Sequence, residues 1–219
     1  MFEKKVLMRF GRWKEILNLN LPQNPHLMLF RTAATRYARA ISFASLGDVS
    51  AAKREANLFD AIRSSPGPRE RILHNNIVSD ILNVESKMMH GEIAYRERNY
   101  ESAFSLLRAA VALQDALKYD EPWAVMQPIR HALGGLLFEQ GHINDAEEVF
   151  RADLKLHPKN PWSLHGLISC LETKQTKKDA WKHSDDIELC MLKVTFSDQR
   201  ALKWADFDIS RSCECCGQG

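Results

Sequence analysis

Two histidines and two glutamates are the residues whose types and spacing could do chemistry. His131 and His165 lie 34 residues apart, at equivalent positions of two successive helical repeats. Helices in contact pack about 8–10 Å apart, so two imidazoles on neighbouring helices could converge on one ion. Glu85 or Glu92 would complete a set of two histidines and one carboxylate, a combination that suits zinc or copper. The alternative is that both histidines make structural hydrogen bonds or line a hydrated groove.

Three cysteines near the end of the sequence form a second candidate site. Cys213, Cys215 and Cys216 lie within four residues of one another. They could bind a soft ion such as Cu(I) or Zn(II), exchange with a disulfide or accept a lipid. Cys213 and Cys215 would add thiolates to the histidine site if the tail folds into the same groove. A C-x-C pair lacks the ligand spacing of a zinc knuckle, so an inert tail is the alternative.

A recurring turn organises the helices that would position these residues. It begins with a helix-breaking or polar residue, continues with a polar and an apolar residue, and leads into a helix that carries an alanine. The alanine would let two helices joined by a short turn approach closely. Clear copies begin at Gly47, Arg98 and Gly141, and weaker copies begin at Gly11 and Gln175. The alanines are Ala52, Ala103, Ala146 and Ala180.

Apolar residues at helical spacing between these turns predict an all-α chain. A helix pair cannot bury its apolar stripes alone, so we expect the pairs to stack. Residues 1–205 are predicted to form a helical repeat domain and 206–219 a non-helical, cysteine-rich tail. The expected helices are a short one within 2–10, then 27–46, 49–63, 69–98 and 100–118, further helices within 121–171, and a last one over 177–205.

The stretch from 134 to 158 resembles a tetratricopeptide repeat (TPR). The residues that carry the likeness are Gly134, Gly141, Ala146, Phe150 and Pro158, spaced as in that repeat. Most of the chain also resembles the C-terminal half of a group of largely uncharacterised microbial TPR proteins, through segments 9–17, 119–134, 157–167 and 212–215. The resemblance implies an α-solenoid of antiparallel helix pairs in a right-handed superhelix, and no secure activity.

In a TPR fold the first helix of each pair faces a concave groove, and the resemblance predicts which residues line it. The aromatic rings would pack an apolar side chain of a ligand, the glutamates would pair a basic residue and the histidines would donate hydrogen bonds. The alternative is that the aromatic residues only pack between repeats. The predicted lining residues are Tyr37, Glu85, Met88, Glu92, Tyr95, His131, Trp162 and His165, with Arg130 at the edge.

The composition limits the function classes. The 219 residues carry a net charge of +2, which gives no electrostatic case for nucleic acid. No stretch approaches the roughly 20 apolar residues of a membrane span, and five cysteines fit a reduced, cytoplasmic setting. We therefore expect a non-catalytic TPR scaffold or adaptor that binds a peptide or partner protein without a cofactor. The alternative is a zinc or copper protein, or a metalloenzyme, that uses His131, His165 and a carboxylate.

Overall fold

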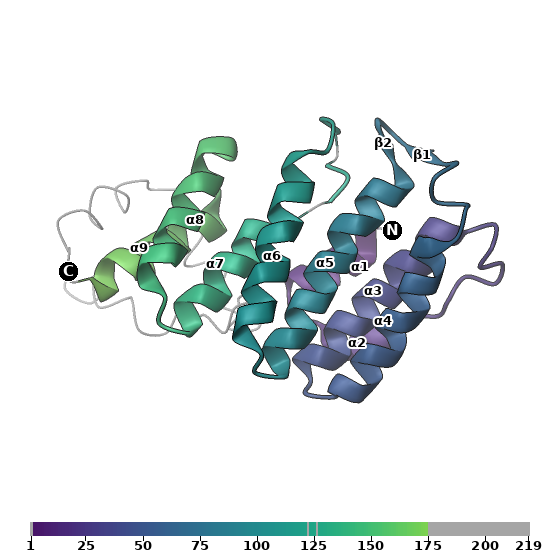
Figure 1. Ribbon diagram of the computed structural model, residues 1–219, viewed down its shortest axis with the longest axis horizontal. Coiled ribbons are helices and arrows are strands. Elements are labelled where there is room, and N and C mark those ends of the chain that lie inside the picture. Colours follow the sequence, from purple (N-terminus) through teal and green to yellow (C-terminus); the bar gives the residue numbers. More distant parts are fainter. Residues whose placement is uncertain (1, 122, 126, 175–219) are drawn as a thin grey trace, which may run out of the picture. The chain divides into compact units, whose positions relative to one another are not determined.

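The structure, a computed structural model, describes residues 2–121, 123–125 and 127–174 (Figure 1). The expected helix over 177–205, the tail over 206–219, and with it Cys213 and Cys215, lie outside the described residues. The chain divides into two compact units: unit 1 comprises Met1–Met8 and Arg12–Ile129, and unit 2 comprises Arg9–Gly11 and Arg130–Gly219. The described elements are α1 (Phe2–Arg9), α2 (Trp13–Leu17), α3 (Leu29–Ser45), α4 (Val49–Ser64), β1 (Ile72–Leu73), β2 (Asn76–Ile77), α5 (Val78–Arg96), α6 (Tyr100–Asp115), α7 (Ile129–Glu139), α8 (Ile143–Leu156) and α9 (Pro161–Thr173).

The described residues are mostly helical, which confirms the all-α prediction. The two strands contain only two residues each. The longest described helix, α5, has 19 residues and carries Asp80, Glu85 and Glu92. Within the described ranges, no helix is both long and apolar enough to cross a bilayer.

The recurring turn has the same backbone geometry in each copy that the structure describes. Its first residues, Gly11, Gly47, Arg98 and Gly141, all have positive φ angles, between 61° and 88°. This left-handed conformation ends a helix readily when the residue is glycine, because glycine has no Cβ. At all four positions, the turn signature in the sequence therefore marks the point where one helix ends and the next begins.

Polar side chains start the helices that follow two of these turns. The side chain of Asp48 accepts a hydrogen bond from the Ala51 amide at 2.9 Å, and that of Asn99 accepts one from the Ser102 amide at 3.3 Å. These bonds satisfy amides that have no partner within the helix. The sequence therefore specifies both the end of one helix and the start of the next.

In unit 1, α3 packs against α4 and α5 packs against α6, while α5 also contacts α3 and α4. Fully buried apolar side chains from these helices form the core, among them Ile41, Phe59 and Ile81. Gly91 permits the close approach of α5 and α6, because a Cβ there would lie 2.9 Å from Cγ of Leu107. Small residues at such contacts therefore have the packing role that the turn alanines were predicted to have, and Ala52 and Ala103 are fully buried too.

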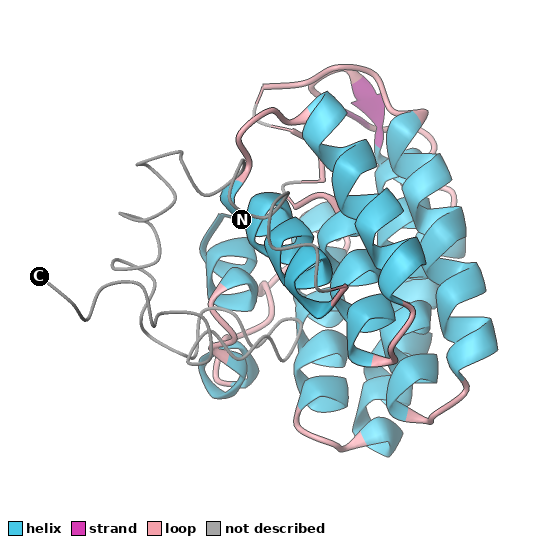
Figure 2. Cartoon of the chain, turned by 90° about the vertical axis from the view of Figure 1, so that its left-hand side faces the viewer, coloured by secondary structure: helices cyan, strands magenta, loops and turns pink. Residues whose placement is uncertain are grey.

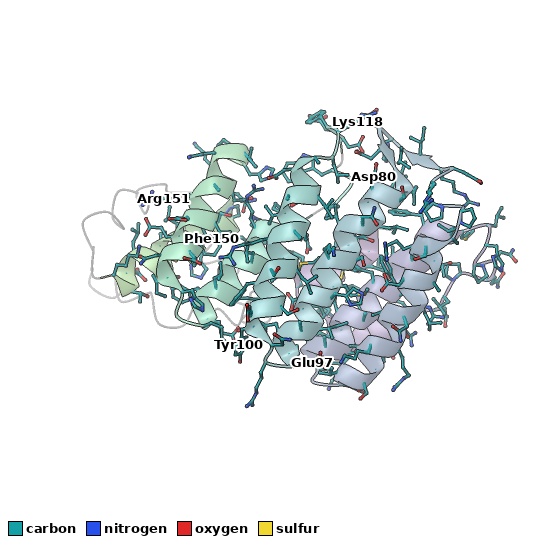
Figure 3. All side chains as sticks on the ribbon, in the orientation of Figure 1. Asp80, Glu97, Tyr100, Lys118, Phe150 and Arg151 are labelled. Carbon is teal, nitrogen blue, oxygen red and sulfur yellow. The ribbon has the colours of Figure 1, made fainter. Side chains whose placement is uncertain are left out.

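Four labelled side chains in Figure 3 show how α5 and α6 are connected. Asp80, near the start of α5, and Lys118, just after α6, lie at one end of these two helices. Glu97 and Tyr100, which flank the turn between the helices, lie at the other end. The two helices are thus joined directly at the Glu97–Tyr100 end.

The predicted helix over 69–98 is wrong in its first third, where the chain forms a hairpin. Strands β1 and β2 pair antiparallel, and His74 in the turn between them has a φ of 53°. Asp120, from the segment after α6, accepts hydrogen bonds from the Asn75 amide at 3.0 Å and from Nδ2 of Asn76 at 2.8 Å. Because this distant carboxylate satisfies the hairpin, α5 begins only at Val78.

Unit 2 contains a core built around one aromatic ring. Phe150 of α8 is buried against Gly134 of α7 and Gly166 of α9 (Figure 3). A Cβ at Gly134 would lie 2.7 Å from the ring, and one at Gly166 would lie 2.3 Å from it. The ring therefore occupies the volume that side chains at both positions would need. Asn160 caps α9 by accepting hydrogen bonds from the amides of the next turn.

Candidate functional site

The candidate site of unit 1 is a pair of buried glutamates on α5 beside a tyrosine on α3. Glu85 and Glu92 are two helical turns apart and therefore lie on one face of α5. Their exposed fractions are 1% and 3%. The pKa of Tyr37 is raised well above its ordinary value of 10.0, first by burial and then by the charges of Glu85 and Glu92. The three side chains thus form one electrostatic site.

A lysine from the N-terminal helix fills this site. The Lys5 ammonium forms an ion pair with Oε1 of Glu85 and lies 4.8 Å from the centroid of the Tyr37 ring. The Lys5 carbonyl accepts a hydrogen bond from Nε2 of Gln127 at 2.9 Å. Helix α1 lies on the side of α3 and α5 that faces away from α4 and α6 (Figure 1; Figure 2). A basic residue of the same chain therefore pairs with Glu85, and the pairing of Glu85 with a basic residue of a ligand stays a prediction.

The ion pair uses one oxygen of Glu85. Its second oxygen, Oε2, is buried and has no hydrogen-bond partner among the described residues. A buried acceptor without a donor costs about 1–3 kcal/mol. Glu85 therefore accepts one donor through Oε1 and could accept a second donor through Oε2.

Two other predicted lining residues of unit 1 are packed in the interior. Met88 is fully buried. The Tyr95 ring contacts Tyr100 and Phe104 of α6 in edge-on geometry, with centroid distances of 5.1 and 6.2 Å. These contacts lie between α5 and α6, the two helices of one expected pair, so they do not test the alternative for Tyr95, which was packing between repeats.

In unit 2, the buried carboxylate of Asp153 connects several polar side chains. Its Oδ2 atom lies 3.0 Å from Nε2 of His131 and accepts a hydrogen bond from the Ser163 hydroxyl at 2.6 Å. Nε2 of His157 lies 3.8 Å from Oδ1. Burial raises the pKa of Asp153, but the hydrogen bonds from His131 and Ser163 outweigh burial and leave the pKa below 3.8. Asp153 is therefore an anion.

The partners of His131 determine its tautomer. Nη2 of Arg9 lies 3.1 Å from Nδ1 of His131, and a guanidinium can only donate. Nδ1 is therefore the acceptor, and Nε2 carries the proton that is donated to Asp153. Burial lowers the pKa of His131 and Arg9 lowers it further, while Asp153 opposes the change. His131 is thus a neutral ring with both nitrogens hydrogen-bonded.

Trp162, predicted to be a platform for a ligand, is a platform for an arginine of the chain itself. The guanidinium carbon of Arg9 lies 3.5 Å from the centroid of the Trp162 ring. The His131 ring stacks on Trp162 with a centroid distance of 6.4 Å and an interplanar angle of 19°. Burial lowers the pKa of Arg9 to about 9, although Asp153 acts in the opposite direction. A cation, an indole and an imidazole thus form one layered cluster.

The remaining predicted site residues of unit 2 are His165 and Arg130, both partly buried. The carbonyl of His165 accepts a hydrogen bond from the Ser169 hydroxyl at 3.1 Å within α9. For the metal site, Glu85 belongs to unit 1 whereas His131 and His165 belong to unit 2. Across the described ranges, no group of three or more His, Cys, Asp or Glu residues is arranged to hold a metal ion. The metal site stays a prediction.

The sequence reasoning missed Lys5, Arg9, Asp153 and Ser163. A signal was available for Asp153, because it lies three residues after Phe150 and thus on the buried face of α8. A charged residue on the apolar face of a helix indicates a buried polar contact. No comparable signal exists for Lys5, whose partner is 80 positions away.

A polar cleft on α4, α5 and α6 was also missed. Its volume is about 540 Å³, and it contains Asp60, Arg63, Ser86 and His90. Asp60 accepts hydrogen bonds from Arg63 at 2.9 Å and Ser86 at 3.1 Å, and lies 2.7 Å from Nε2 of His90. Burial raises the pKa of Asp60, but these hydrogen bonds, first that of His90, outweigh burial and lower the pKa to about 2. The group is a surface network centred on an anion.

The comparisons with known proteins add no family to this picture, so the TPR resemblance stays a prediction. The chain matches no protein-family model, no curated protein and no solved structure.

Proposed function

We propose that this protein is a non-catalytic helical scaffold whose α3–α5 face binds a segment of a partner protein that carries a basic residue. One observation carries the proposal: Lys5 lies between Glu85 and Tyr37, with both acid and ring buried beneath it. A buried carboxylate is stable only when a cation or several donors accompany it. The face formed by α3 and α5 is therefore built to receive a cation on an apolar stem.

The TPR-like solenoid of antiparallel pairs is part of this proposal. The shared turn geometry at Gly11, Gly47, Arg98 and Gly141 supports it. The direct joining of α5 and α6 at the Glu97–Tyr100 end also supports it, because helices that are packed together and joined by a short turn run in opposite directions (Figure 3). In a stack of such pairs, the first helices all lie on one side, and α3 and α5 would be those first helices.

The fixed partners of the buried polar groups favour binding over catalysis. His131 is neutral with both nitrogens engaged, and Glu85 is paired with an ammonium. A general acid or base needs a pKa near the working pH and a free approach for its substrate. His131 instead has both nitrogens engaged by Arg9 and Asp153, and Oε1 of Glu85 is held in an ion pair with Lys5, as recognition requires.

The experiment that tests the proposal uses the full chain and the variant Glu85→Gln, with Glu101→Gln as matched control because Glu101 is an exposed acid on α6. Each protein is immobilised and exposed to a lysate of the source cells. A retained protein is identified, purified and titrated by calorimetry, and its contact segment is mapped by cross-linking. We expect a partner with a basic segment to bind the chain and the control but to bind Glu85→Gln at least tenfold more weakly. Equal affinity for all three proteins would overturn the proposal.

A further inference from the structure

One face of α1 is buried and the opposite face is exposed. Lys5 and Met8, one helical turn apart, are both buried, whereas Val6 is 48% exposed. This division is that of an amphipathic helix lying on a surface. Apart from its chain connection, α1 therefore contacts unit 1 as a helical peptide ligand would.

The intrinsic stability of α1 is low. The helix has eight residues, four of them charged. Isolated helices shorter than about 12–15 residues are marginal in water, because nucleation is unfavourable. The helical state of α1 therefore depends on its contacts with the surface beneath it.

One of these contacts is unfavourable. Lys4 is only 7% exposed, and the charges that act on it are those of Arg31 and Glu3. Burial lowers the pKa of Lys4 and Arg31 lowers it further, while Glu3 opposes the change without reversing it. Docking α1 thus places one cation against Glu85 and a second cation where a charge is penalised.

The ion pair also leaves part of the site unused. An ammonium reaches Oε1 of Glu85 while the buried Oε2 has no donor among the described residues. A guanidinium presents parallel donors that match both oxygens of a carboxylate, which an ammonium cannot do. An arginine side chain would therefore suit this site better than the lysine that occupies it.

We propose that α1 is a ligand of its own chain and can be displaced by a helix of a partner protein. That helix carries an arginine at the position of Lys5 and an apolar residue one turn later. The inference rests on the proposed function, since it names the chemistry of the partner segment. A tethered segment competes at an effective concentration of about millimolar, so a free segment must bind more tightly to replace it. The bidentate arginine supplies that difference in affinity.

Two synthetic peptides provide the probes: one has the sequence of residues 2–9, FEKKVLMR, and the other has the same sequence with K5R. Each is titrated by NMR into the isotope-labelled full chain, which detects millimolar affinities. Lys5→Ala and Met8→Asp release α1 through two different contacts, and Lys5→Ala/Glu85→Gln removes the site as well. Lys14→Ala, at an exposed lysine of α2, is the matched control. Arg9 is unchanged in every variant.

We expect Lys5→Ala and Met8→Asp to bind the lysine peptide at least tenfold more tightly than the unmodified chain and Lys14→Ala do. The arginine peptide should bind these two variants about fivefold more tightly still, and Lys5→Ala/Glu85→Gln should bind neither peptide. Hydrogen exchange of residues 2–8 should become faster in both release variants.

The possible failures separate the two proposals. Equal peptide affinity with and without the release substitutions would overturn displacement by α1 and leave the proposed function standing. Absence of peptide binding in variants whose residues 2–8 exchange freely would overturn the inference and the proposed recognition of a basic residue together. Unchanged protection of residues 2–8 in both release variants would also overturn displacement. Equal affinity for the two peptides would overturn the preference for arginine.

Discussion

Lys5 and Glu85 are 80 positions apart in the chain and form an ion pair that is almost completely shielded from water. Such a pair gains little over two apolar residues of similar size, because both charges lose their hydration. Removing one partner is different, since the other charge then remains buried alone. The difference between removing one partner and replacing both can therefore be measured as a free energy of unfolding.

We expect Lys5→Met to lower the free energy of unfolding by about 3 kcal/mol, because it leaves the Glu85 carboxylate without its cation. The double variant Lys5→Met/Glu85→Leu should recover most of that loss. Urea denaturation of the two single variants and the double variant measures the coupling. A loss in the double variant equal to the sum of the single losses would show that the two side chains are independent. If α1 undocks in Lys5→Met, the loss is limited to the free energy of docking α1, and hydrogen exchange of residues 2–8 reports this.

The neighbouring lysine should have the opposite effect. Lys4→Met removes a buried cation beside Arg31 and keeps an apolar side chain, so we expect the free energy of unfolding to rise by about 1 kcal/mol. The folded-state pKa of Lys4 lies below the unfolded value of 10.5. The charge therefore destabilises the folded state below the folded pKa, and this penalty disappears as the pH rises through the folded pKa toward 10.5.

The Lys4→Met measurement is made by urea denaturation at neutral and at alkaline pH. Its advantage over the unmodified chain should shrink as the pH rises. Lys14→Met, at an exposed lysine, is the control and should leave the free energy of unfolding within about 0.5 kcal/mol. A destabilised Lys4→Met would contradict the assignment of Lys4 as an unfavourable contact.

A packing prediction concerns unit 2. Gly166→Ala would place a methyl group 2.3 Å from the Phe150 ring, so we expect a loss of about 1–3 kcal/mol in the free energy of unfolding. Gly166→Ala/Phe150→Leu should lose less than the two single variants together, because the smaller side chain makes room. Thermal unfolding of the three variants checks this compensation. Strictly additive losses would show that the Phe150 ring is not what requires glycine at position 166.

Local features of the fold could be predicted from the sequence, because they depend on residues close together in the chain. Gly47 ends one helix by its positive φ, and Asp48 begins the next by capping it. The expected helix over 49–63 accordingly matches α4, which ends one residue later. The hairpin of β1 and β2 could not be predicted in this way, because Asp120 satisfies it from far along the chain.

The candidate site shows the same division. Residue types on α5 predicted that Glu85 would pair with a basic residue of a ligand, whereas in the structure the cation comes from the same chain. The sequence could not show that Lys5 supplies it, since nothing local links α1 to α5. Likewise, His131 was predicted to line the groove or to bind a metal, but its contact with Asp153 depends on how α7 and α8 pack.

The last prediction uses the protonation of His131. Its folded-state pKa lies below the unfolded value of 6.5, because burial and Arg9 disfavour the charged ring. Below 6.5 the unfolded chain binds a proton that folded His131 does not, so stability should fall as the pH falls from 6.5 toward the folded pKa. Asp153 acts in a lower window: its folded pKa lies below 3.8, so its contribution is present above 3.8 and is lost as the pH falls through the folded pKa.

His131→Gln should therefore flatten the pH dependence of stability between about pH 7 and pH 5. It should also weaken the Asp153 contribution below 3.8, because the hydrogen bond of His131 is one cause of the lowered Asp153 pKa. At pH 7 the variant should lose about 1–3 kcal/mol, because Gln cannot reproduce both hydrogen bonds of the ring. Urea unfolding across this pH range measures both effects, with His26→Gln, at an exposed loop histidine, as control. The control should keep the slope of the unmodified chain. A slope for His131→Gln as steep as that of the control would mean that His131 does not contribute to the pH dependence, which would contradict a folded-state pKa below 6.5.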